Sequence, residues 1–415
     1  MPIKQQNILR CFLWFLASFF MAFQFVVRLS VGVLKEKIIN KFSMNLAEFG
    51  TMAGFYYISY AGGQIPMSLL IEKYRVKYVL PFAIILTSTG CVGFALSNSI
   101  YILYFSRFVI GLGSAAAFVS IVKIVTTLFD DKYYSILISI SISIAMVGAI
   151  MGTTPMYIIF NKFGYENSFY ILSLFSLILS ILIFVISSIV DNDLPSQSKL
   201  EEKVSTRNIL YTILTNKFVF ILSISGGRMV GSLEGFADVW GISYIEDVYN
   251  INREDATKYI SLIYIGMCIG SPILSLFAFL INSENISLTI ISILTSFIFY
   301  ILLYKHTIVD SHTLYLLMFF IGILCSYQCL VFVSAKKYIK SKVLTISIAV
   351  INSINMSFGH FFHSIIGNAM YNIKQTNSDI LISDLYIYSL KIIPICSVIS
   401  IIGFVYLIYF DHSKK

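Results

Sequence analysis

The stretch CFLWFLASFFMAFQFVVRLSVGVL (Cys11–Leu34) establishes the fold class of this chain. It is apolar along almost its whole length, and Arg28 is its only charged residue. A helix needs about 20 such residues to cross the hydrocarbon core of a bilayer. The stretch therefore predicts a transmembrane helix, and comparable stretches recur along the rest of the sequence.

The composition supports a membrane location for the whole chain. Of its 415 residues, 58% are hydrophobic and 12% are charged, whereas soluble domains contain about 25% charged residues. The pattern predicts an all-α integral membrane protein with twelve transmembrane helices. The expected spans are 9–34, 46–71, 77–97, 100–127, 134–160, 168–190, 218–245, 256–281, 286–304, 313–335, 342–370 and 386–410.

The longest polar segment lies near the middle of the chain, at residues 191–217. It separates the predicted spans into two sets of six, as expected for two structural halves around a central cavity. We therefore predict a six-helix bundle at 1–190, a cytoplasmic linker at 191–217 and a second six-helix bundle at 218–415.

Lysine and arginine in the loops predict the orientation, because cytoplasmic loops carry an excess of both. The excess falls on one side when both termini are placed in the cytoplasm, with Lys73, Lys77 and Lys336 among the residues that contribute. This bias explains the net charge of +8, so the charge is not taken as a sign of nucleic-acid binding. Abundant Ile, Lys, Asn and Tyr are typical of proteins encoded by AT-rich bacterial genomes. This usage favours a location in a bacterial cytoplasmic (inner) membrane. The first span is expected to be retained, since Arg28 interrupts it beyond the length of a signal peptide.

Five charged residues lie deep inside predicted spans, away from the ends: Arg28, Arg107, Arg228, Glu234 and Asp238. A charge at this depth costs about 2.5–3.5 kcal/mol on insertion scales. Such residues usually face a water-filled cavity or one another, and they mark the path of a solute or proton. The chain is therefore predicted to be a transporter with these residues near its working centre.

Several short motifs resemble those of the major facilitator superfamily. SLLIEKYRVK (Ser68–Lys77) resembles its loop pattern G-x-L-x-D-R-x-G-x-R, with Ser68 and Arg75 in place of the two glycines. RFVIGLGSAAA (Arg107–Ala117) resembles R-x-x-x-G-x-G-x-A, and GAIMGTTP (Gly148–Pro155) resembles a loosened G-x-x-x-G-P. FGYENSFY (Phe163–Tyr170) is similar to the segment that opens the sixth span in that family.

The similarity is nearest to the organic-anion branches of the superfamily, namely the organophosphate antiporters and the anion:cation symporters. QFVVRLSVGVL (Gln24–Leu34) looks like their first helix, in which the arginine at the position of Arg28 contacts an anionic group of the substrate. EGFADVWGISYIEDV (Glu234–Val248) is similar to their seventh helix, but Glu234 stands where the organophosphate antiporters have a second arginine. Dipeptide carriers of the same superfamily are further relatives. The resemblance implies that spans one, four, seven and ten line the cavity.

The candidate residues can each be assigned a role and an alternative. Arg28 is expected to bind an anionic group through its planar guanidinium; the alternative is a permanent ion pair with Glu234 or Asp238. Glu234 and Asp238 are four residues apart and share one helix face, so they, with Arg107, are candidates for proton coupling. The alternative is that the two carboxylates only neutralise Arg107 and Arg228. If Glu234 instead holds an ammonium group while Arg28 holds a carboxylate, the solute is zwitterionic.

The remaining candidates serve binding or conformational change. The predicted substrate-binding set is Arg28, Arg228, Glu234, Gln64 and Gln328; the predicted gating set is Glu72, Lys73, Lys77, Gly111, Gly113, Gly152 and Pro155. The glycines around Arg228 predict a soft helix, or simply close helix packing. His360 and His363 are candidates for a proton relay or for hydrogen bonds between helices. No cofactor and no metal site is predicted.

The predicted function is secondary active transport of a small organic anion or zwitterion by alternating access, coupled to protons, by a functional monomer. No enzyme signature and no nucleotide-binding loop is present in the sequence. The alternatives are a hydrophobic-drug/proton exporter, which favours an apolar and acidic cavity, and a non-transporting receptor on the same fold. A receptor has no need for buried charges such as Arg28 and Glu234.

Overall fold

The computed structural model describes residues 3–192, 215–339 and 344–413, and these ranges are helical almost throughout, with no strand. Most of the predicted linker at 191–217 lies outside them. The all-α membrane fold expected from the sequence is confirmed.

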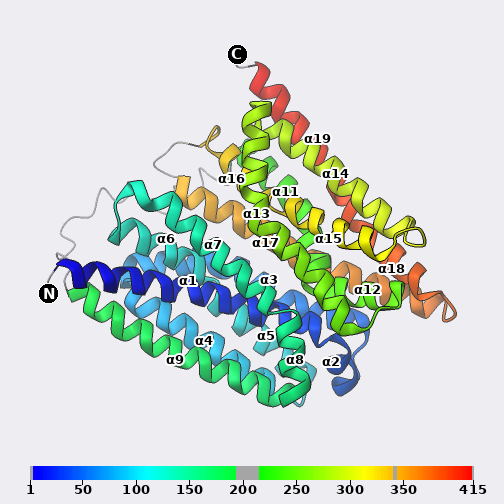
Figure 1. Cartoon of the computed structure of the whole chain (residues 1–415), viewed down its shortest axis with the longest axis horizontal. Coiled ribbons are helices and arrows are strands. Elements are labelled where there is room, and N and C mark those ends of the chain that lie inside the picture. The colour runs from blue at the N-terminus through cyan, green and yellow to red at the C-terminus, as the bar shows by residue number, and fades with distance from the viewer. Residues whose placement is uncertain (1–2, 193–214, 340–343, 414–415) are drawn as a thin grey trace. The chain divides into compact units, whose positions relative to one another are not determined.

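The chain folds into a succession of helices (Figure 1). Those before the linker are α1 (Ile3–Val33), α2 (Lys35–Phe42), α3 (Leu46–Tyr74), α4 (Val76–Ala95), α5 (Ile100–Ser114), α6 (Ala116–Leu128), η1 (Asp131–Tyr133), α7 (Tyr134–Met151), α8 (Thr154–Phe163) and α9 (Tyr165–Asn192). Those after it are α11 (Lys217–Met229), η2 (Val230–Ser232), η3 (Leu233–Trp240), α12 (Gly241–Tyr249), α13 (Arg253–Ile281), α14 (Glu284–Tyr304), α15 (Ser311–Cys325), α16 (Gln328–Ala335), α17 (Leu344–Thr376), α18 (Ile382–Leu390) and α19 (Ile392–Ser413).

Eight helices in the described ranges are long and apolar enough to span a membrane, and a bent pair makes a ninth. The bent pair joins Ile136–Met151 to Thr154–Phe163 at an angle of 44°, where the sequence has its glycine–proline motif. The other three predicted spans coincide with α3, with the segments from α11 to α12, and with α17. The count of twelve is consistent with the architecture but stays a prediction.

Polar residues begin several of these helices. Ser99, Asn216, Asn252, Ser283 and Asp310 each accept a hydrogen bond from a backbone N–H in the first turn of the helix that follows. Such caps satisfy amide groups that the helix itself leaves unpaired. Between the caps, large apolar side chains are exposed along α9, α14 and α19. This outward apolar surface is the one that lipid chains cover in a multi-pass membrane protein.

The chain divides into two compact units. Unit 1 comprises Met1–Ser30 and Ile58–Ser205, and unit 2 comprises Val31–Tyr57 and Thr206–Lys415. Within unit 1, α4 packs along α9; within unit 2, α13 packs on α15, and α14 on α19 (Figure 1). The segment Val31–Tyr57, which precedes the linker in sequence, is therefore grouped with the C-terminal helices. The predicted bundle boundaries at 190 and 218 stay predictions.

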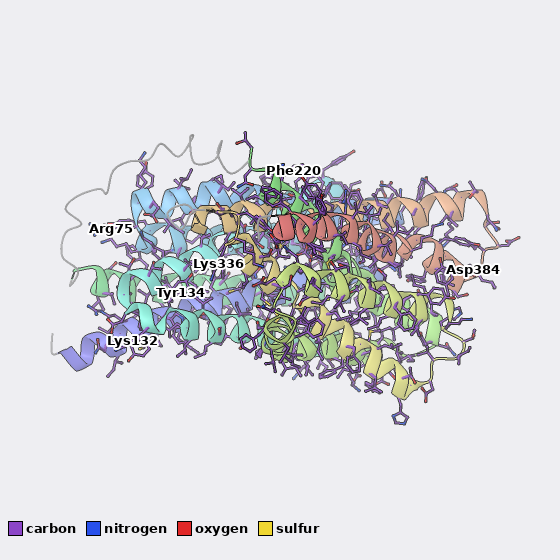
Figure 2. The ribbon with its side chains drawn as sticks, turned by 90° about the horizontal axis from the view of Figure 1, so that it is seen from above. Arg75, Lys132, Tyr134, Phe220, Lys336 and Asp384 are labelled. Atoms are coloured by element: carbon purple, nitrogen blue, oxygen red, sulfur yellow. The ribbon has the colours of Figure 1, made fainter. Side chains whose placement is uncertain are left out.

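The loop motif after α3 places a strained residue at a helix junction. Arg75 adopts φ 68° and ψ 155°, a region that is open to glycine and costly for other residues. It is one of the two positions where the family pattern has glycine. In unit 1, Arg75 lies toward the same end of the bundle as Lys132 (Figure 2), whereas in unit 2 Lys336 and Asp384 lie toward opposite ends (Figure 2).

Candidate functional site

The seventh predicted span is not one regular helix. The α-helix α11 ends at Met229, a 3₁₀ turn follows at Val230–Ser232, and a π-helix covers Leu233–Trp240 before α12 begins at Gly241. The helix type therefore changes three times along this span, and Gly227 and Gly231 pack closely against Phe358 and Phe362 of α17. Single π-helical segments inside longer helices are frequent at functional sites. Both predicted acidic residues, Glu234 and Asp238, lie within this one.

Asp238 is held by hydroxyl groups from two other helices. The carboxylate is 1% exposed. Its Oδ1 accepts a hydrogen bond of 2.7 Å from the hydroxyl of Tyr264 in α13, and its Oδ2 accepts one from the hydroxyl of Tyr57 in α3. Hydrogen bonds of this kind stabilise a buried carboxylate, yet neither donor carries a fixed charge. Sequence reasoning missed the two tyrosines, because tyrosine is common throughout the chain.

Glu234 lies beside the same tyrosine. Its side chain is fully buried, and its Oε2 faces Gly359 of α17 together with the ring of Tyr57. Any side chain at position 359 would collide with both groups. The structure thus brings Glu234 and Asp238 together around Tyr57, as expected from their spacing on one helix face.

Histidines from α17 complete this cluster in unit 2. The ring of His363 is 4.9 Å from that of Tyr57, and the ring of His360 is 6.4 Å from that of Phe55. Gly54 lies directly against His360, and Gly50 against the backbone of His363. Small residues let two membrane helices approach closely, so the glycines of α3 place the histidines near the acidic pair. The sequence singled out the histidines but not these glycines.

The two buried arginines of unit 1 have different surroundings. Arg107 donates hydrogen bonds to the main-chain carbonyls of Val27 (3.1 Å) and Arg28 (2.7 Å) in α1. The guanidinium of Arg28 lies 4.9 Å from the ring centre of Phe25, and its side chain is 3% exposed. Both arginines are therefore deep inside the bundle, as the sequence predicted, and Arg107 ties α5 to α1.

The other predicted binding residues lie on several helices. Gln64 is buried in α3 of unit 1, whereas Arg228 in α11 and Gln328 in α16 are partly exposed in unit 2.

The predicted gating residues belong to unit 1. Glu72 accepts hydrogen bonds of 2.9 Å at both carboxylate oxygens from Lys123 of α6, while Lys73 and Lys77 lie against the rings of the tyrosines that follow them. Gly113 packs against the backbone of α4, and Gly152 against α1. Pro155 stands in the first turn of α8, at the bend in the fifth span. Gly111 is buried in α5. The glycine contacts are those of close helix packing.

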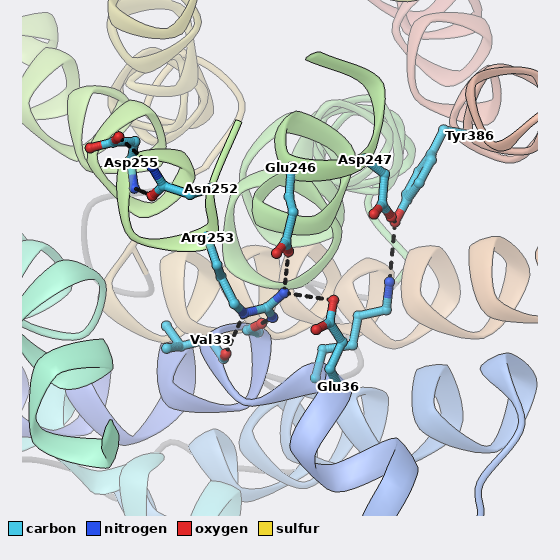
Figure 3. Close-up of polar contacts among 10 residues, drawn as sticks. Val33, Glu36, Glu246, Asp247, Asn252, Arg253, Asp255 and Tyr386 are labelled. Carbon is cyan, nitrogen blue, oxygen red and sulfur yellow. Dashed lines mark hydrogen bonds and ion pairs between the residues drawn. The ribbon is translucent and has the colours of Figure 1, made fainter. Parts of the chain in front are cut away.

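A second polar network ties the end of α1 and the start of α2 to the C-terminal helices of unit 2 (Figure 3). Arg253 donates to the carbonyls of Gly32 and Val33, each at 3.0 Å, and pairs with Glu36 (3.0 Å) and Glu246. The last carbonyls of a helix have no partner within it, so Arg253 caps α1.

Lys35 is the buried cation of this network. Its Nζ donates to the hydroxyl of Tyr386 (3.2 Å), which in turn donates to Asp247 (2.7 Å). The side chain is 5% exposed, and Nζ lies 5.1 Å from the ring centre of Trp240. Burial lowers the pKa of Lys35 to about 8, although the negative charge of Asp247 opposes that shift. Burial also raises the pKa of Glu246, against the effect of Arg253.

Comparisons with known proteins agree with this architecture. The "Protein TsgA homolog" of Buchnera aphidicola subsp. Acyrthosiphon pisum is 25% identical over 283 residues, which are 68% of this chain and 69% of the relative. The "Uncharacterized transporter YybO" of Bacillus subtilis is 23% identical over 167 residues, 40% of this chain and 38% of the relative.

Solved structures share the fold at low sequence identity. A bacterial homolog of the human lysosomal transporter Spinster, in an inward-facing and unoccupied conformation, superposes with a TM-score of 0.70 at 13% identity, covering 96% of this chain and 95% of that one. A point mutant of the nucleoside transporter NupG gives a TM-score of 0.71 at 14% identity, covering 95% of this chain and 99% of that one.

The family model of the Major Facilitator Superfamily matches residues 13–362. That range includes α1, the loop motif after α3, the broken seventh span and most of α17. Members of the superfamily carry small-molecule solutes across membranes, so the chain is a transporter rather than an enzyme. The chain belongs to the Major Facilitator Superfamily.

Proposed function

We propose that this transporter moves a small organic anion or zwitterion across the cytoplasmic membrane and couples that movement to protons. Its mechanism is alternating access, and the functional form is a monomer. Both termini are assigned to the cytoplasm, because that orientation places most loop lysines and arginines on the inner side.

The observation that carries the proposal is the acidic pair of the π-helix. Glu234 and Asp238 are both buried; the hydroxyl of Tyr57 donates to Asp238, and the carboxylate of Glu234 and the ring of Tyr57 both face Gly359. Buried carboxyl groups inside a membrane span are rare and mark the path of a solute or proton, so this pair is the proposed proton site. Binding a proton at this pair from one side of the membrane and releasing it to the other is the step that couples the gradient to transport.

The partners of the pair suit such a step. The hydroxyls of Tyr57 and Tyr264 can rotate and can donate to an ionised carboxylate or accept from a protonated one. His363 lies next to Tyr57, and an imidazole titrates near neutral pH. A proton can therefore move between neighbouring groups of this cluster without a large rearrangement of the backbone. Arg107, in unit 1, is the third predicted member of the coupling set.

Arg28 is the proposed site for the anionic group of the solute. A buried guanidinium presents donors in a planar fork that matches a carboxylate or phosphate. The side chain is 3% exposed and lies 4.9 Å from the ring centre of Phe25, and a charged hydrogen bond at a buried position is stronger than in water. Gln64, Arg228 and Gln328 are further proposed binding residues.

The test is uptake into proteoliposomes from a panel of labelled amino acids, dipeptides, carboxylates and sugar phosphates, with and without a pH gradient. Wild-type protein is expected to accumulate at least one anionic or zwitterionic solute only when the gradient is present. Arg28→Ala should abolish that uptake and Arg28→Lys should reduce it, since lysine keeps the charge but loses the fork.

Glu234→Gln should leave exchange of labelled for unlabelled solute intact and remove the dependence on the gradient. Asp379→Asn, a change at an exposed carboxylate outside the helices, is the control and should behave as wild type. Gradient-driven uptake at the wild-type rate in both Arg28→Ala and Glu234→Gln would remove the proposed roles of these residues.

A further inference from the structure

A buried asparagine in α17 has none of the hydrogen bonds that its side chain can form. Asn355 is fully buried, yet neither its Nδ2 nor its Oδ1 has a hydrogen-bond partner among the described residues. Buried polar side-chain atoms in native proteins nearly always have such partners. An unpaired amide in an apolar interior destabilises the fold, so a leucine of similar size would serve packing better.

A second amide lies on the neighbouring helix. The Nε2 of Gln328 in α16 is also buried without a hydrogen-bond partner in the described part of the chain, although the residue as a whole is partly exposed. Gln328 and Val331 are three residues apart and share one face of α16. Val331 and Asn355 in turn both face Gly226 of α11, so α16 borders the turn of α17 that carries Asn355.

Gly226 lets the backbone of α11 pack closely against Asn355 and Val331. A methyl group at position 226 would lie 3.3 Å from Oδ1 and 3.4 Å from Nδ2 of Asn355, and 3.3 Å from Cγ2 of Val331. The carbonyl of Gly226 is already taken, because the hydroxyl of Tyr327 donates to it at 2.8 Å. The backbone of α11 therefore borders the amide of Asn355 without satisfying it.

The acidic pair lies one helical turn away along α17. Gly359 follows Asn355 by four residues, which places both on one face about 5–6 Å apart. Because the carboxyl group of Glu234 faces Gly359, the proposed proton site and the unpaired amide succeed each other along this face. A molecule bound at Asn355 therefore lies next to the proposed proton site and meets a donor beside an acceptor.

We propose that Asn355, assisted by Gln328, binds an amide group of the transported solute. A side-chain amide and a second amide satisfy each other, because each offers a donor beside an acceptor. The solute is then a small organic anion or zwitterion that also carries an amide, such as an amino acid with a side-chain carboxamide or a short peptide. This assignment rests on the proposed function. It narrows the substrate class to solutes that carry an amide group.

The test combines thermal unfolding and binding with the purified full-length protein in detergent. Asn355→Leu should raise the unfolding temperature in the absence of solute, because it removes an unpaired buried amide. The matched control is Asn285→Leu. Asn285 is also fully buried, but it bonds Tyr338 (2.8 Å), Asp411 (2.9 Å) and Ser334 (2.7 Å), so its replacement should lower the unfolding temperature.

Binding is measured by the rise in unfolding temperature that a ligand causes, using glutamine, glutamate, glutamate γ-methyl ester and glycylglycine. Wild type should be stabilised by glutamine or glycylglycine and less by the acid and the ester. In Asn355→Leu the apparent affinity for the amides should fall roughly tenfold or more, as the loss of one or two hydrogen bonds implies. Gly226→Ala should weaken the binding of the same compounds.

Three results would overturn the assignment: a lower unfolding temperature in Asn355→Leu, unchanged amide binding in that variant, or a wild type that no amide stabilises. These results are separate from those that test the proposed function. Uptake that is the same with and without a pH gradient would refute proton coupling, and wild-type uptake in Arg28→Ala would refute the anion site. The comparison of Asn355→Leu with wild type would remain valid in either case.

Discussion

Buried charges in the two units have different kinds of partner. In unit 1, Arg107 is bound by main-chain carbonyls of α1, whereas in unit 2, Asp238 is bound by the hydroxyls of Tyr57 and Tyr264. Helix carbonyls are fixed by the backbone and cannot change their role. Tyrosine hydroxyls rotate and exchange between donating and accepting. We infer that the first arrangement serves the scaffold and that the second allows protonation to change during transport.

The same contrast recurs in the network at the start of α2. Arg253 binds the carbonyls of Gly32 and Val33, while Lys35 binds the hydroxyl of Tyr386. Arginine has a fixed charge at all relevant pH values, but the pKa of Lys35 is lowered to about 8. The side-chain partners differ as well, since Arg253 pairs with the carboxylates of Glu36 and Glu246, whereas Lys35 donates to a neutral hydroxyl.

The largest effect is expected for Asp238→Asn. The variant keeps the size and the hydrogen-bonding groups of the side chain but cannot exchange a proton, so accumulation against a solute gradient should be abolished. Counterflow of labelled solute in proteoliposomes should persist and shows that the protein folds. Accumulation driven by a pH gradient at the wild-type level would mean that Asp238 has only a structural role.

Arg107→Lys should mainly affect stability. Lysine keeps the charge but cannot bond two carbonyls from one planar group, and each charge-assisted hydrogen bond contributes about 1.5–3 kcal/mol. We expect a loss of roughly 2–4 kcal/mol, visible as a lower unfolding temperature in detergent. If stability is unchanged while transport fails, Arg107 belongs to the coupling machinery rather than to the scaffold.

Lys35 makes stability depend on pH. Its pKa is about 8 in the folded protein and 10.5 ordinarily. Between these values the unfolded chain binds more protons than the folded one, so stability rises with pH over that window. The burial of a charged Lys35, beside Asp247, Glu36, Glu246 and Arg253, destabilises the protein below pH 8.

Wild type should therefore gain about 1–3 kcal/mol between about pH 8 and pH 10.5, since one pKa unit corresponds to about 1.36 kcal/mol. Lys35→Met should remove this gain, and Lys305→Met, at the exposed end of α14, should preserve it. Parallel pH profiles for wild type and Lys35→Met would contradict the lowered pKa.

The smallest effects are expected for alanine substitutions at two glycines, Gly148 in unit 1 and Gly359 in unit 2. A methyl at Gly148 would meet the backbone of Ala22, whereas one at Gly359 would meet the side chains of Glu234 and Tyr57. Backbone yields less than side chains, so Gly148→Ala should cost about 1–3 kcal/mol and Gly359→Ala less. Transport should show the opposite order, with the greater loss in Gly359→Ala. If both variants have equal effects on unfolding temperature and on uptake, the proposed difference between a packing glycine in unit 1 and a site glycine in unit 2 is wrong.

The sequence predicted much of the candidate site through charge alone. Arg28, Arg107, Glu234 and Asp238 were conspicuous because charges inside apolar spans are rare, and all four are buried in the structure. Tyr57, Tyr264 and Asn355 were not identified as site residues, since uncharged polar residues occur in many spans. Their importance depends on which helices lie beside them, and hydropathy contains no information about that.

Hydropathy, charge and short motifs along the chain were enough to establish the membrane fold, the family and the positions of the buried charges in the sequence. These follow from the cost of placing polar groups in hydrocarbon, a property of each segment taken alone. Packing in three dimensions was needed to show that the seventh span passes through 3₁₀ and π segments, that Val31–Tyr57 joins the C-terminal unit, and which partner each charge has. Those outcomes depend on contacts between segments far apart in sequence, where a single glycine, as at Gly359, determines whether two groups can meet.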